Sequence, residues 1–577
     1  MIWNYRQPVD LEEARKFALI LEKPMKYIQF LQGRGYQSLQ DIKDFREADL
    51  KSLPAPESLP GMQEAVSYFL QAYSRHDTIA IFGDYDADGL TSTALLTITL
   101  ESLGFKVISQ IPNRLSDGYG LNSAAVRNLH SKGAGLLVTV DCGVSDWEAV
   151  TTANELKFPV IITDHHQIPP ILPPAQAIIN PHLGGGWETH PLAGVGVAFM
   201  LAWAIVRAFK YHNLCQKLEP PLVETLALVA LGTIADLAPL TGTNRILVRQ
   251  GLRFLEGTSW PSLKALKSSA NLEKDQKIST WDVGFRLAPK LNAAGRMGNA
   301  NPALELLITK DLARAQKLAD VLTTINQNRY DSQVRLLEDA LKLLKSQAES
   351  PDSRTVVLAK EKWPRGLLGL VASRIAEIFR KPTILLCLEN EFAYGSGRSI
   401  PGFDLFSALG ATRHICISVG GHAEAAGLKL RAADISAFKE AFEESAKLQP
   451  IPPQEAEILI DLEVDYDDLE VLYNAFQDLE PFGQGHPAPL VALRDIEVID
   501  AVPTRTKGDK HIMLRLSKGP NSFSFVGFNM AQKLYNLEKK IDLVLSLDNS
   551  RFNQKITGWR LVDFKKAGES LPPYRSL

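Results

Sequence analysis

The chain has few cysteines and no long apolar run. Its 577 residues contain four cysteines, which stand far apart and form no Cys-x-x-Cys pair. Neither a disulfide framework nor a thiolate zinc site is supported, and a reducing compartment fits best. No stretch of about 18 apolar residues occurs, and the first residues lack the basic run and apolar core of a secretion signal. We therefore expect a cytoplasmic location and no membrane partner.

The chain also lacks internal repeats, low-complexity tracts and a strong net charge. The formal net charge is -3, which by itself does not indicate a polyanion as partner. The charge is nevertheless zoned along the chain. Residues 241–300 carry ten Lys and Arg against four Asp and Glu, whereas residues 451–480 carry ten Asp and Glu and no Lys or Arg. The acidic zone is a poor surface for nucleic acid and suits solvent or a basic partner.

The length exceeds what one hydrophobic core organises, so several domains are expected. From about residue 76, short Val- and Ile-rich runs alternate with helical patterns, which predicts βαβ units and a buried parallel sheet. The predicted strands are 78–82, 106–111, 135–140 and 159–163, with helices at 91–103 and 145–156.

The remainder of the chain predicts further domains. A loop rich in Pro and Gly covers 169–194, helices follow near 195–211 and 222–237, and a long helical pattern covers about 303–348 with an interruption near 326–329. A second, smaller α/β unit begins at about 354, and alternating strands near the end predict a β-barrel of the OB type. The predicted domains are 1–50 (helical), 51–305 (catalytic), 306–350 (connecting helix), 351–448 (substrate-binding) and 449–577 (barrel).

Acidic and histidine side chains gather where the predicted strands end. Such sites form at the carboxyl ends of strands in open α/β sheets. Carboxylates mixed with neutral imidazole suit two divalent cations and a phosphate substrate, and favour Mn²⁺ over Ca²⁺. The set consists of Asp84, Asp86 and Asp88 after the first strand, then Asp141, Asp164-His165-His166, and Asp236 in an otherwise apolar stretch.

Each of these motifs has an ordinary structural alternative. Asp84-x-Asp86-x-Asp88-Gly89 resembles the start of a calcium loop, but Leu95 stands where that loop needs a Glu. A solvated acidic turn, a helix cap at Asp141 and a polar His-His loop are common as well. Crowded carboxylates repel one another unless cations neutralise them, so their combination favours a metal site.

At these residues the chain resembles the DHH phosphoesterase superfamily, and within it the RecJ family of single-strand-specific 5′→3′ exonucleases. The resemblance covers about residues 50–565. It rests on Gly83-Asp84-Tyr85-Asp86-Ala87-Asp88-Gly89, Val140-Asp141-Cys142-Gly143, Asp164-His165-His166, Gly232-Thr233-Ile234-Ala235-Asp236, Leu291-Asn292-Ala293-Ala294-Gly295-Arg296, Gly395-Ser396-Gly397-Arg398-Ser399 and Gly420-Gly421-His422.

The resemblance implies a parallel-sheet DHH domain, a smaller α/β DHH-associated domain joined to it by a long helix, and a C-terminal OB-like barrel. It also implies two Mn²⁺ or Mg²⁺ ions, with Mn²⁺ preferred. Many superfamily members have a His ligand where this chain has Phe82. Asp84 is then either the substitute ligand or a proton acceptor. The implied metal ligands are Asp86, Asp88, Asp141, His165 and Asp236, with Asp141 as the bridge and His166 facing the scissile phosphate.

By the same resemblance, Arg114, Ser396 and Arg398 form a pocket for a 5′-terminal phosphate, since an Arg fork binds phosphate bidentately. Asn292 and Arg296 would contact the DNA backbone, Tyr119 could stack on a base, and His422 would touch phosphate or only cap its turn. The basic zone and the barrel would extend the DNA track, although alternating Phe residues are more often core. The candidate barrel residues are Arg505, Lys507, Lys510, Arg515, Phe523, Phe525 and Phe528.

We therefore expect a metal-dependent exodeoxyribonuclease that releases 5′-mononucleotides from single-stranded DNA in repair and recombination. The resemblance implies a monomer, with a single-strand-binding protein or a helicase as protein partner. Two other functions compete with this one. The first is a DHH-type phosphodiesterase of short oligonucleotides or other small phosphate substrates, and the second is a non-catalytic replication scaffold that binds single strands without consuming them.

Overall fold

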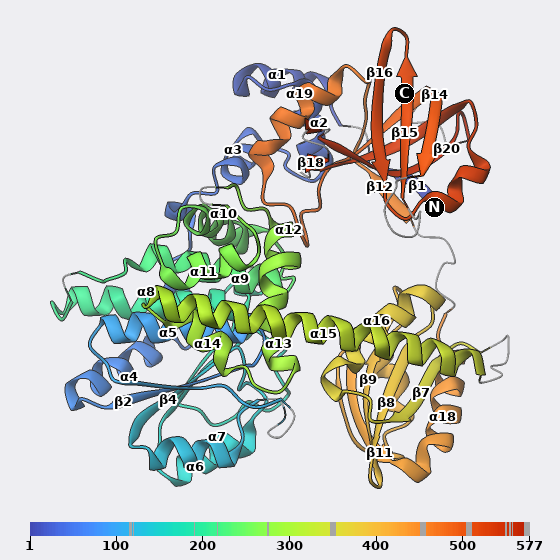
Figure 1. The fold of residues 1–577 in the computed structure, drawn as a ribbon. Coiled ribbons are helices and arrows are strands. Elements are labelled where there is room, and N and C mark those ends of the chain that lie inside the picture. Colours follow the sequence, from blue (N-terminus) through green and yellow to red (C-terminus); the bar gives the residue numbers. More distant parts are fainter. Residues whose placement is uncertain are drawn as a thin grey trace. The chain divides into compact units, whose positions relative to one another are not determined.

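The structure, a computed structural model, divides the chain into two compact units (Figure 1). Unit 1 comprises Met1–Leu53, Pro239–Arg249 and Gln454–Leu577, and unit 2 comprises Pro54–Ala238 and Gln250–Pro453. The residues that the structure describes are 1–7, 9–114, 118, 120–189, 191–215, 217–273, 276–346, 353–450, 457–503, 511–548, 551–552, 555–556 and 558–569.

The first lobe of unit 2 is built on a five-stranded, fully parallel sheet, as the sequence predicts. Its strand order is β3-β2-β4-β5-β6. The predicted strands are present, and β6 is an additional strand inside the segment 169–194 that we expected to be a loop. The strands are β2 (Thr78–Gly83), β3 (Val107–Gln110), β4 (Ala134–Val140), β5 (Val160–Thr163) and β6 (Ala177–Ile179).

Helices cover both faces of this sheet (Figure 1). Helices α6 (Ser123–Ser131) and α7 (Trp147–Glu155) enclose one core with the sheet. Helix α5 (Ala87–Ser102) packs on the other face and contacts α8 (Gly194–Tyr211) and α9 (Leu226–Ala235). Helix α4 (Met62–Arg75) packs against α8. By length and apolarity α8 could cross a membrane, but 72% of it is buried inside the unit. Its apolar character therefore reflects its place in the core.

The end of this lobe is helical, and a single long helix leads from it to a second lobe. This helix, α15 (Leu312–Ser346), is continuous through 326–329, so the predicted interruption there is wrong. The break falls before it, between α14 (Asn301–Ile308) and α15, where the extended Thr309 ends α14. The other helices of this part are α10 (Gly242–Glu256), which the division between the units crosses, α11 (Pro261–Ser269), α12 (Thr280–Asp282), the π-helical turn η6 (Val283–Leu287) and α13 (Ala288–Arg296).

The second lobe of unit 2 is a mixed α/β layer structure. Its sheet has the order β10-β11-β9-β8-β7, in which only β7 and β8 are parallel. Residues 395–398 belong to strand β9, so the glycine-rich segment Gly395-Ser396-Gly397 is extended and does not form a tight turn. The elements are β7 (Val356–Glu361), α16 (Leu368–Phe379), β8 (Thr383–Glu389), β9 (Phe392–Arg398), α17 (Leu405–Gly410), β10 (Cys416–Gly421), β11 (Ala425–Arg431) and α18 (Ile435–Lys447).

Unit 1 contains a closed β-barrel, which confirms the predicted OB-like fold. Pairing runs β14-β15-β16-β20-β17, and β17 also pairs with β14, which closes the barrel. The remaining short strands are β12 (Glu457–Ile460), β13 (Leu462–Glu463), β18 (Arg551–Phe552) and β19 (Lys555–Ile556). The barrel strands are β14 (Leu490–Pro503), β15 (Ile512–Lys518), β16 (Asn521–Gly527), β17 (Lys540–Leu547) and β20 (Trp559–Lys566).

The beginning of the chain completes unit 1. Strand β1 (Ile2–Tyr5) pairs with β12 in parallel, and the helices α1 (Leu11–Leu21), α2 (Met25–Gly33) and α3 (Leu39–Glu47) share one apolar core with the barrel and α19 (Asp468–Phe476). The predicted domain borders follow the order of the chain, whereas these contacts unite its first and last parts.

The acidic zone 451–480 finds its basic partners inside unit 1, in the part of the chain that the structure describes. The buried Asp461 carboxylate pairs with Arg6 at 2.7 Å and with Arg34 at 2.8 Å. Glu463 pairs with Arg494 at 3.0 Å, and Asp478 pairs with Lys23 and Arg46. Much of the acidity of this zone therefore stabilises contacts within the unit.

The basic zone 241–300 is also partly internal. Arg245 is 2% exposed, and its guanidinium donates to the carbonyls of Leu479 at 2.8 Å and Pro481 at 3.1 Å. Lys267 is buried and donates to the Leu255 carbonyl at 3.1 Å. Lys290 is buried as well and donates to the Thr323 hydroxyl at 2.8 Å. These three cations are therefore unavailable to a DNA track.

Candidate active site

The carboxyl ends of three neighbouring strands hold the centre of the site. Asp84 follows β2, Asp141 follows β4 and Asp164 follows β5, and these strands are adjacent in the sheet. All three carboxylates are buried. Asp141 has a φ of 61°, a left-handed conformation that is costly for a residue with a side chain. The sequence-based placement of these acids at one edge of the sheet is thus correct.

The start of α5 contributes two further acids. Asp86 is the N-cap residue, and its Oδ1 accepts hydrogen bonds from the backbone N–H groups of Asp88 at 3.0 Å and Gly89 at 3.1 Å. Asp88 lies in the first turn, almost fully buried. Its two oxygens accept the N–H groups of Gly194 at 2.7 Å and Val195 at 2.8 Å, which begin α8. Two helix N-termini therefore meet at this carboxylate.

Only glycine fits at residue 194, because α8 begins so close to Asp88 and Asp141. A Cβ at residue 194 would lie 2.4 Å from Asp141 Oδ1, which leaves no room for any side chain. The same residue donates its backbone N–H to Asp88. The backbone of α8 can therefore contact both acids only because residue 194 is glycine.

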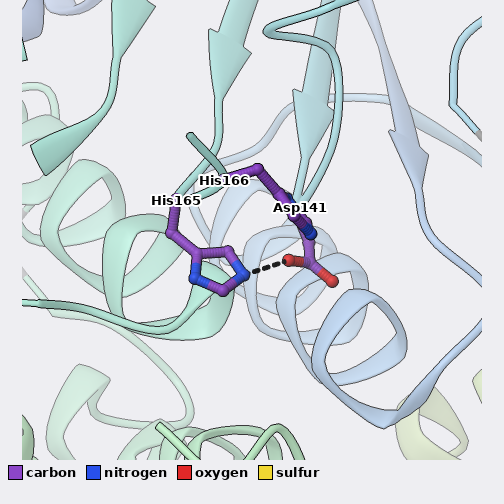
Figure 2. A group of neighbouring side chains, drawn as sticks. All are labelled: Asp141, His165 and His166. Atoms are coloured by element: carbon purple, nitrogen blue, oxygen red, sulfur yellow. Dashed lines mark ion pairs between the residues drawn. The ribbon is translucent and has the colours of Figure 1, made fainter. Parts of the chain in front are cut away.

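The remaining ligand candidates come from a loop and a helix end. His165 Nε2 lies 3.1 Å from Asp141 Oδ1, 3.8 Å from Asp88 Oδ2 and 3.8 Å from Asp236 Oδ2. Figure 2 shows the His165 ring facing the Asp141 carboxylate. Asp236 directly follows helix α9, so it reaches the site from the C-terminal end of a helix.

These side chains form overlapping groups that could hold metal ions. In each group the candidate ligand atoms lie within 4.8 Å of one another. The first group is Asp84, Asp86 and Asp141, the second is Asp88, His165 and Asp236, and the third is Asp141, His165 and His166. Asp141 belongs to the first and third groups and contacts His165 of the second, so it is the acid that links the three groups.

The electrostatics of the acids match a cation site. Burial, followed by repulsion from neighbouring carboxylates, raises the pKa of Asp84, Asp88 and Asp141 well above the usual range. Burial and Asp86 raise the pKa of Asp236 to about 7. Asp84 Oδ1 and Asp141 Oδ1 are buried without a hydrogen-bond partner among the described residues. Such oxygens are costly unless a ligand binds them, and divalent cations are suitable ligands.

His165 and His166 differ in charge because their surroundings differ. Burial and the neighbouring His166 lower the pKa of His165 to about 4, so its imidazole is neutral and able to bind a metal. Burial also lowers the pKa of His166, but a 2.7 Å hydrogen bond with Asp164 outweighs it and raises that pKa to about 9. At neutral pH His166 is therefore a cation.

Asp164 is the residue whose role the sequence did not reveal. Its Oδ1 accepts the backbone N–H groups of His165 and His166 and the ring N–H of His166, and its Oδ2 accepts the Val144 N–H. Both oxygens are thus engaged by the protein, and Asp164 orients His166. The signal that was present is an acid placed directly between a buried strand and the two histidines.

Arginines from both lobes of unit 2 gather near the acids. The Arg114 guanidinium lies over the Tyr85 ring at 4.9 Å. Arg398 donates to the Ser396 hydroxyl at 3.3 Å. The Arg398 guanidinium also lies against the start of α16, because a Cβ at Gly369 would be only 2.7 Å from it. Burial, and next the charge of Arg114, lowers the pKa of both Arg398 and Arg296. The pKa of Arg296 falls to about 10. These arginines have no ion pair among the described residues, so their charges suit an anion.

Comparison with known proteins identifies the family. Three family models match: the DHH family N-terminal domain over residues 78–233, the DHHA1 domain over 352–448 and the RecJ OB domain over 460–558. The single-stranded-DNA-specific exonuclease RecJ of Bacillus subtilis is 33% identical over 98% of this chain and 72% of its own length. The RecJ of Escherichia coli is 35% identical over 90% of this chain and 92% of its own. The chain belongs to the RecJ family.

Solved RecJ structures extend the match to three dimensions. RecJ of Thermus thermophilus in complex with Mn²⁺ is 31% identical, covers 98% of this chain and 79% of its own, and gives a TM-score of 0.82. The same protein in complex with Mg²⁺ gives a TM-score of 0.76 at 30% identity, over 98% of this chain and 78% of its own. Two kinds of divalent cation thus bind a RecJ of this fold, and the acids and His165 described above fit such ions chemically.

The Phe82 departure from the wider superfamily has a structural explanation. Phe82 is buried in the core that the sheet shares with α6 and α7. Asp84 instead lies within ligand distance of Asp86 and Asp141. The structure therefore has a candidate ligand carboxylate two residues after Phe82.

The other predicted binding residues differ in position. Asn292 Oδ1 accepts the Ala87 N–H at 2.7 Å, so this side chain supports the start of α5. His422 is exposed, and its Nδ1 accepts the Glu424 N–H at 3.3 Å, which caps the turn between β10 and β11. Tyr119 lies outside the described residues.

The candidate DNA-binding residues of the barrel differ in exposure. Phe525 is buried in the core, and Phe523 stacks on Tyr466 with ring centroids 4.0 Å apart. Phe528 and Arg515 are exposed. Arg505, Lys507 and Lys510 lie outside the described residues.

Proposed function

We propose that this chain is a metal-dependent exodeoxyribonuclease that degrades single-stranded DNA in the 5′→3′ direction and releases 5′-mononucleotides. One observation carries the proposal: two groups of candidate metal ligands meet at Asp141, whose buried Oδ1 has no hydrogen-bond partner among the described residues. The chain aligns over most of its length with exonucleases named as specific for single-stranded DNA. DNA repair and recombination are the processes that use such an activity.

The metal centre would use the five ligands expected from the sequence together with Asp84. Asp84, Asp86 and Asp141 would hold one divalent cation, and Asp88, His165 and Asp236 the other, with Asp141 shared. We assign Asp84 to a ligand role because it belongs to the first group. Bound Mn²⁺, the preferred ion, or Mg²⁺ supplies an activated water and neutralises charge on the attacked phosphate.

The chain's own residues would orient the substrate and neutralise its charge. His166, kept protonated by Asp164, would donate a hydrogen bond to a scissile phosphate oxygen and stabilise negative charge there. The neutral His165 would keep its metal-binding nitrogen available. No nucleophilic side chain is needed, because water is the nucleophile in a metal-assisted hydrolysis.

A 5′-terminal phosphate would bind between the lobes' arginines. Arg114, Ser396 and Arg398 would form the pocket, and the guanidinium fork would recognise two phosphate oxygens at once. A dianionic terminal phosphate gains more from this cluster than an internal phosphodiester, which sets the polarity. Arg296 and Asn292 would contact the backbone, Tyr119 would stack on a base, and His422 would touch phosphate.

The barrel of unit 1 would bind the strand, through exposed groups such as Arg515 and Phe528 and not through the buried Phe525. We also propose that the protein acts as a cytoplasmic monomer and meets a single-strand-binding protein or a helicase. The predicted domain borders, with a connecting helix at 306–350, are part of this proposal.

The decisive experiment compares labelled substrates with and without Mn²⁺. Single and double strands of tens of nucleotides, labelled at the 5′ or the 3′ end, are incubated with the full chain. We expect Mn²⁺-dependent release of a labelled mononucleotide at once from the 5′-labelled single strand, and slow or no attack on duplex. Rapid cleavage of dinucleotides alone would favour the phosphodiesterase of small substrates instead.

The Asp141→Ala variant tests the metal assignment. It should lose activity at every Mn²⁺ concentration while circular dichroism shows a folded chain. Full activity of a folded Asp141→Ala protein would refute the two-metal proposal. Binding of single strands by wild type without any turnover would indicate the scaffold function.

A further inference from the structure

A fourth arginine, Arg329, lies near the arginines of the site but comes from the middle of the connecting helix α15. Its side chain is half-buried. It belongs to the polar run Asn326-Gln327-Asn328-Arg329. The helix is continuous through this run, so its polar residues do not serve to end or bend the helix. Their composition needs another explanation.

The packing of α13 against α15 brings Arg329 to the level of Arg296. Lys290 on α13 donates to the Thr323 hydroxyl on α15 at 2.8 Å. Arg296 and Arg329 each lie six residues further along their helices, and the two guanidinium groups are close enough that Arg329 lowers the pKa of Arg296 after burial, Arg114 and Arg398. The hydrogen bond joins the two helices six residues before these arginines, and the electrostatic effect agrees with this placement.

The surroundings of Arg329 orient its charge without neutralising it. Its guanidinium donates to Asn326 Oδ1 at 3.0 and 3.2 Å and to Gln333 Oε1 at 2.7 Å, and both acceptors are neutral amides. No carboxylate pairs with Arg329 among the described residues. By contrast, Arg314 on the same helix pairs with Glu305 at 2.6 Å. A half-buried arginine held only by amides, beside another cation, is poised for an anion.

The second lobe of unit 2 contacts the end of α13 close to Arg296. A Cβ at Gly366 would lie 2.2 Å from the Arg296 carbonyl oxygen, so the segment before α16 touches the end of α13. Arg398, like Arg114 and Arg329, lowers the pKa of Arg296 electrostatically. Arg329 therefore adds its charge to that of the arginines from both lobes.

We propose that Arg329, oriented by Asn326 and Gln333, binds an internal phosphate of the DNA strand, next to the phosphates held by Arg296 and the 5′ pocket. The proposal rests on the proposed nuclease function, since it assumes a polynucleotide substrate. It gives the connecting helix a substrate-binding role in addition to linking the lobes. Arg329 would then act on strand affinity and not on the chemistry at the metal centre.

The test measures single-strand binding by fluorescence anisotropy in EDTA, so that cleavage does not interfere. R329Q is compared with wild type and with R335Q, a control that removes an exposed arginine of the same helix. We expect R329Q to bind about ten- to a hundredfold more weakly, the range for a lost hydrogen bond to a charged group. The slope of log K against log[salt] should fall by about 0.7, the value for one phosphate contact on a single strand.

Four further measurements separate an internal phosphate from other roles. The loss in R329Q should be equal on strands with a 5′-phosphate and with a 5′-hydroxyl. A neutral methylphosphonate is then placed at successive positions of the strand. At one of these positions it should weaken strand binding by the wild-type protein and leave strand binding by R329Q unchanged. R329K, which retains the charge, should keep most of the salt slope, and the kcat of R329Q with Mn²⁺ should stay within about twofold of wild type while KM rises.

Several outcomes would overturn the inference. Unchanged affinity and salt slope in R329Q would exclude a phosphate contact. A loss confined to 5′-phosphorylated strands would place Arg329 in the terminal pocket, and equal losses in R329K and R329Q at an unchanged slope would indicate a purely structural role. A wild-type protein that binds strands without degrading them would refute the proposed function, yet the binding comparison would still decide the role of Arg329.

Discussion

Asp84, Asp88 and Asp141 of unit 2 are buried beside other carboxylates, whereas the buried acids of unit 1 each lie beside a cation or another donor. In unit 2, burial and then neighbouring carboxylates raise the pKa of Asp84, Asp88 and Asp141, and two of their oxygens have no hydrogen-bond partner among the described residues. In unit 1, Asp461 has two arginines. Asp542 pairs with Arg494 at 2.9 Å, and Asp563 with the Trp3 N–H and Lys533.

The contrast separates two uses of a buried carboxylate. A paired acid contributes to the specific assembly of its unit, and removing it leaves its partner buried and unsatisfied. Carboxylates that lie beside one another instead repel, and a bound cation relieves this repulsion. The same residue type is structural in one unit and functional in the other, and only its neighbours tell the two apart.

The largest effect is expected from Asp141→Asn. Activity with Mn²⁺ should fall by ~10³-fold or more, because the shared ligand of both cations is lost. The metal-free free energy of unfolding should stay unchanged or rise, since a repelled buried charge is removed. Steady-state kinetics and urea unfolding in EDTA measure the two quantities. A large loss of metal-free stability would mean that Asp141 is structural, as the acids of unit 1 are.

Asp461→Ala should have the opposite profile. It leaves Arg6 and Arg34 without their carboxylate, so we expect the free energy of unfolding to fall by about 3–5 kcal/mol. Asp465→Ala is the matched control, because its pair with Lys518 is exposed and should contribute at most about 1 kcal/mol. Denaturant unfolding of both variants checks the difference. Equal effects of the two substitutions would contradict the proposed contrast.

Mn²⁺ should stabilise the wild-type chain and not the Asp141→Asn variant. At about 100 times the dissociation constant, one bound ion adds about 2.7 kcal/mol to the native state. The gain arises because the ion neutralises acids that otherwise repel one another. Thermal unfolding at increasing Mn²⁺ measures it, with Asp461→Ala as a variant that should retain the full increment.

The smallest effect concerns pH and unit 1. Burial, then Arg245 and Arg34, lowers the pKa of His486 to about 2, and its neutral ring accepts from Arg34 while facing the Leu479 carbonyl. The unfolded chain binds the proton at about pH 6.5, so stability is complete above that pH and is lost as the pH falls. Between pH 7 and pH 5 the loss should be about 2 kcal/mol from this residue.

Urea unfolding of wild type and His486→Gln at both pH values measures this loss. The variant should be less stable at pH 7 but less sensitive to acid. His414→Gln, which changes an exposed histidine, serves as control and should keep the wild-type difference. An unaltered acid sensitivity in His486→Gln would show that other groups determine it.

Local patterns were sufficient to predict the sheet edge. The apolar runs before Asp84, Asp141 and Asp164 predicted parallel strands, and the rule that such strands end at one edge brought the three acids together. Local patterns failed where a distant contact decides. The strand β6 is too short to show a period, and the polar run at 326–329 does not interrupt α15.

The sequence by itself predicted most of the sheets, helices and candidate ligands, because these depend on the periodicity and spacing of neighbouring residues, and its motifs carried the resemblance to the family. Only the tertiary structure decided that residues 1–53 complete the barrel unit, that the acidic zone is paired internally, that Asp164 orients His166, and that the helices of Arg296 and Arg329 pack together. Each of these depends on contacts between residues far apart in the chain, and a charge's role follows from the partner that folding places beside it.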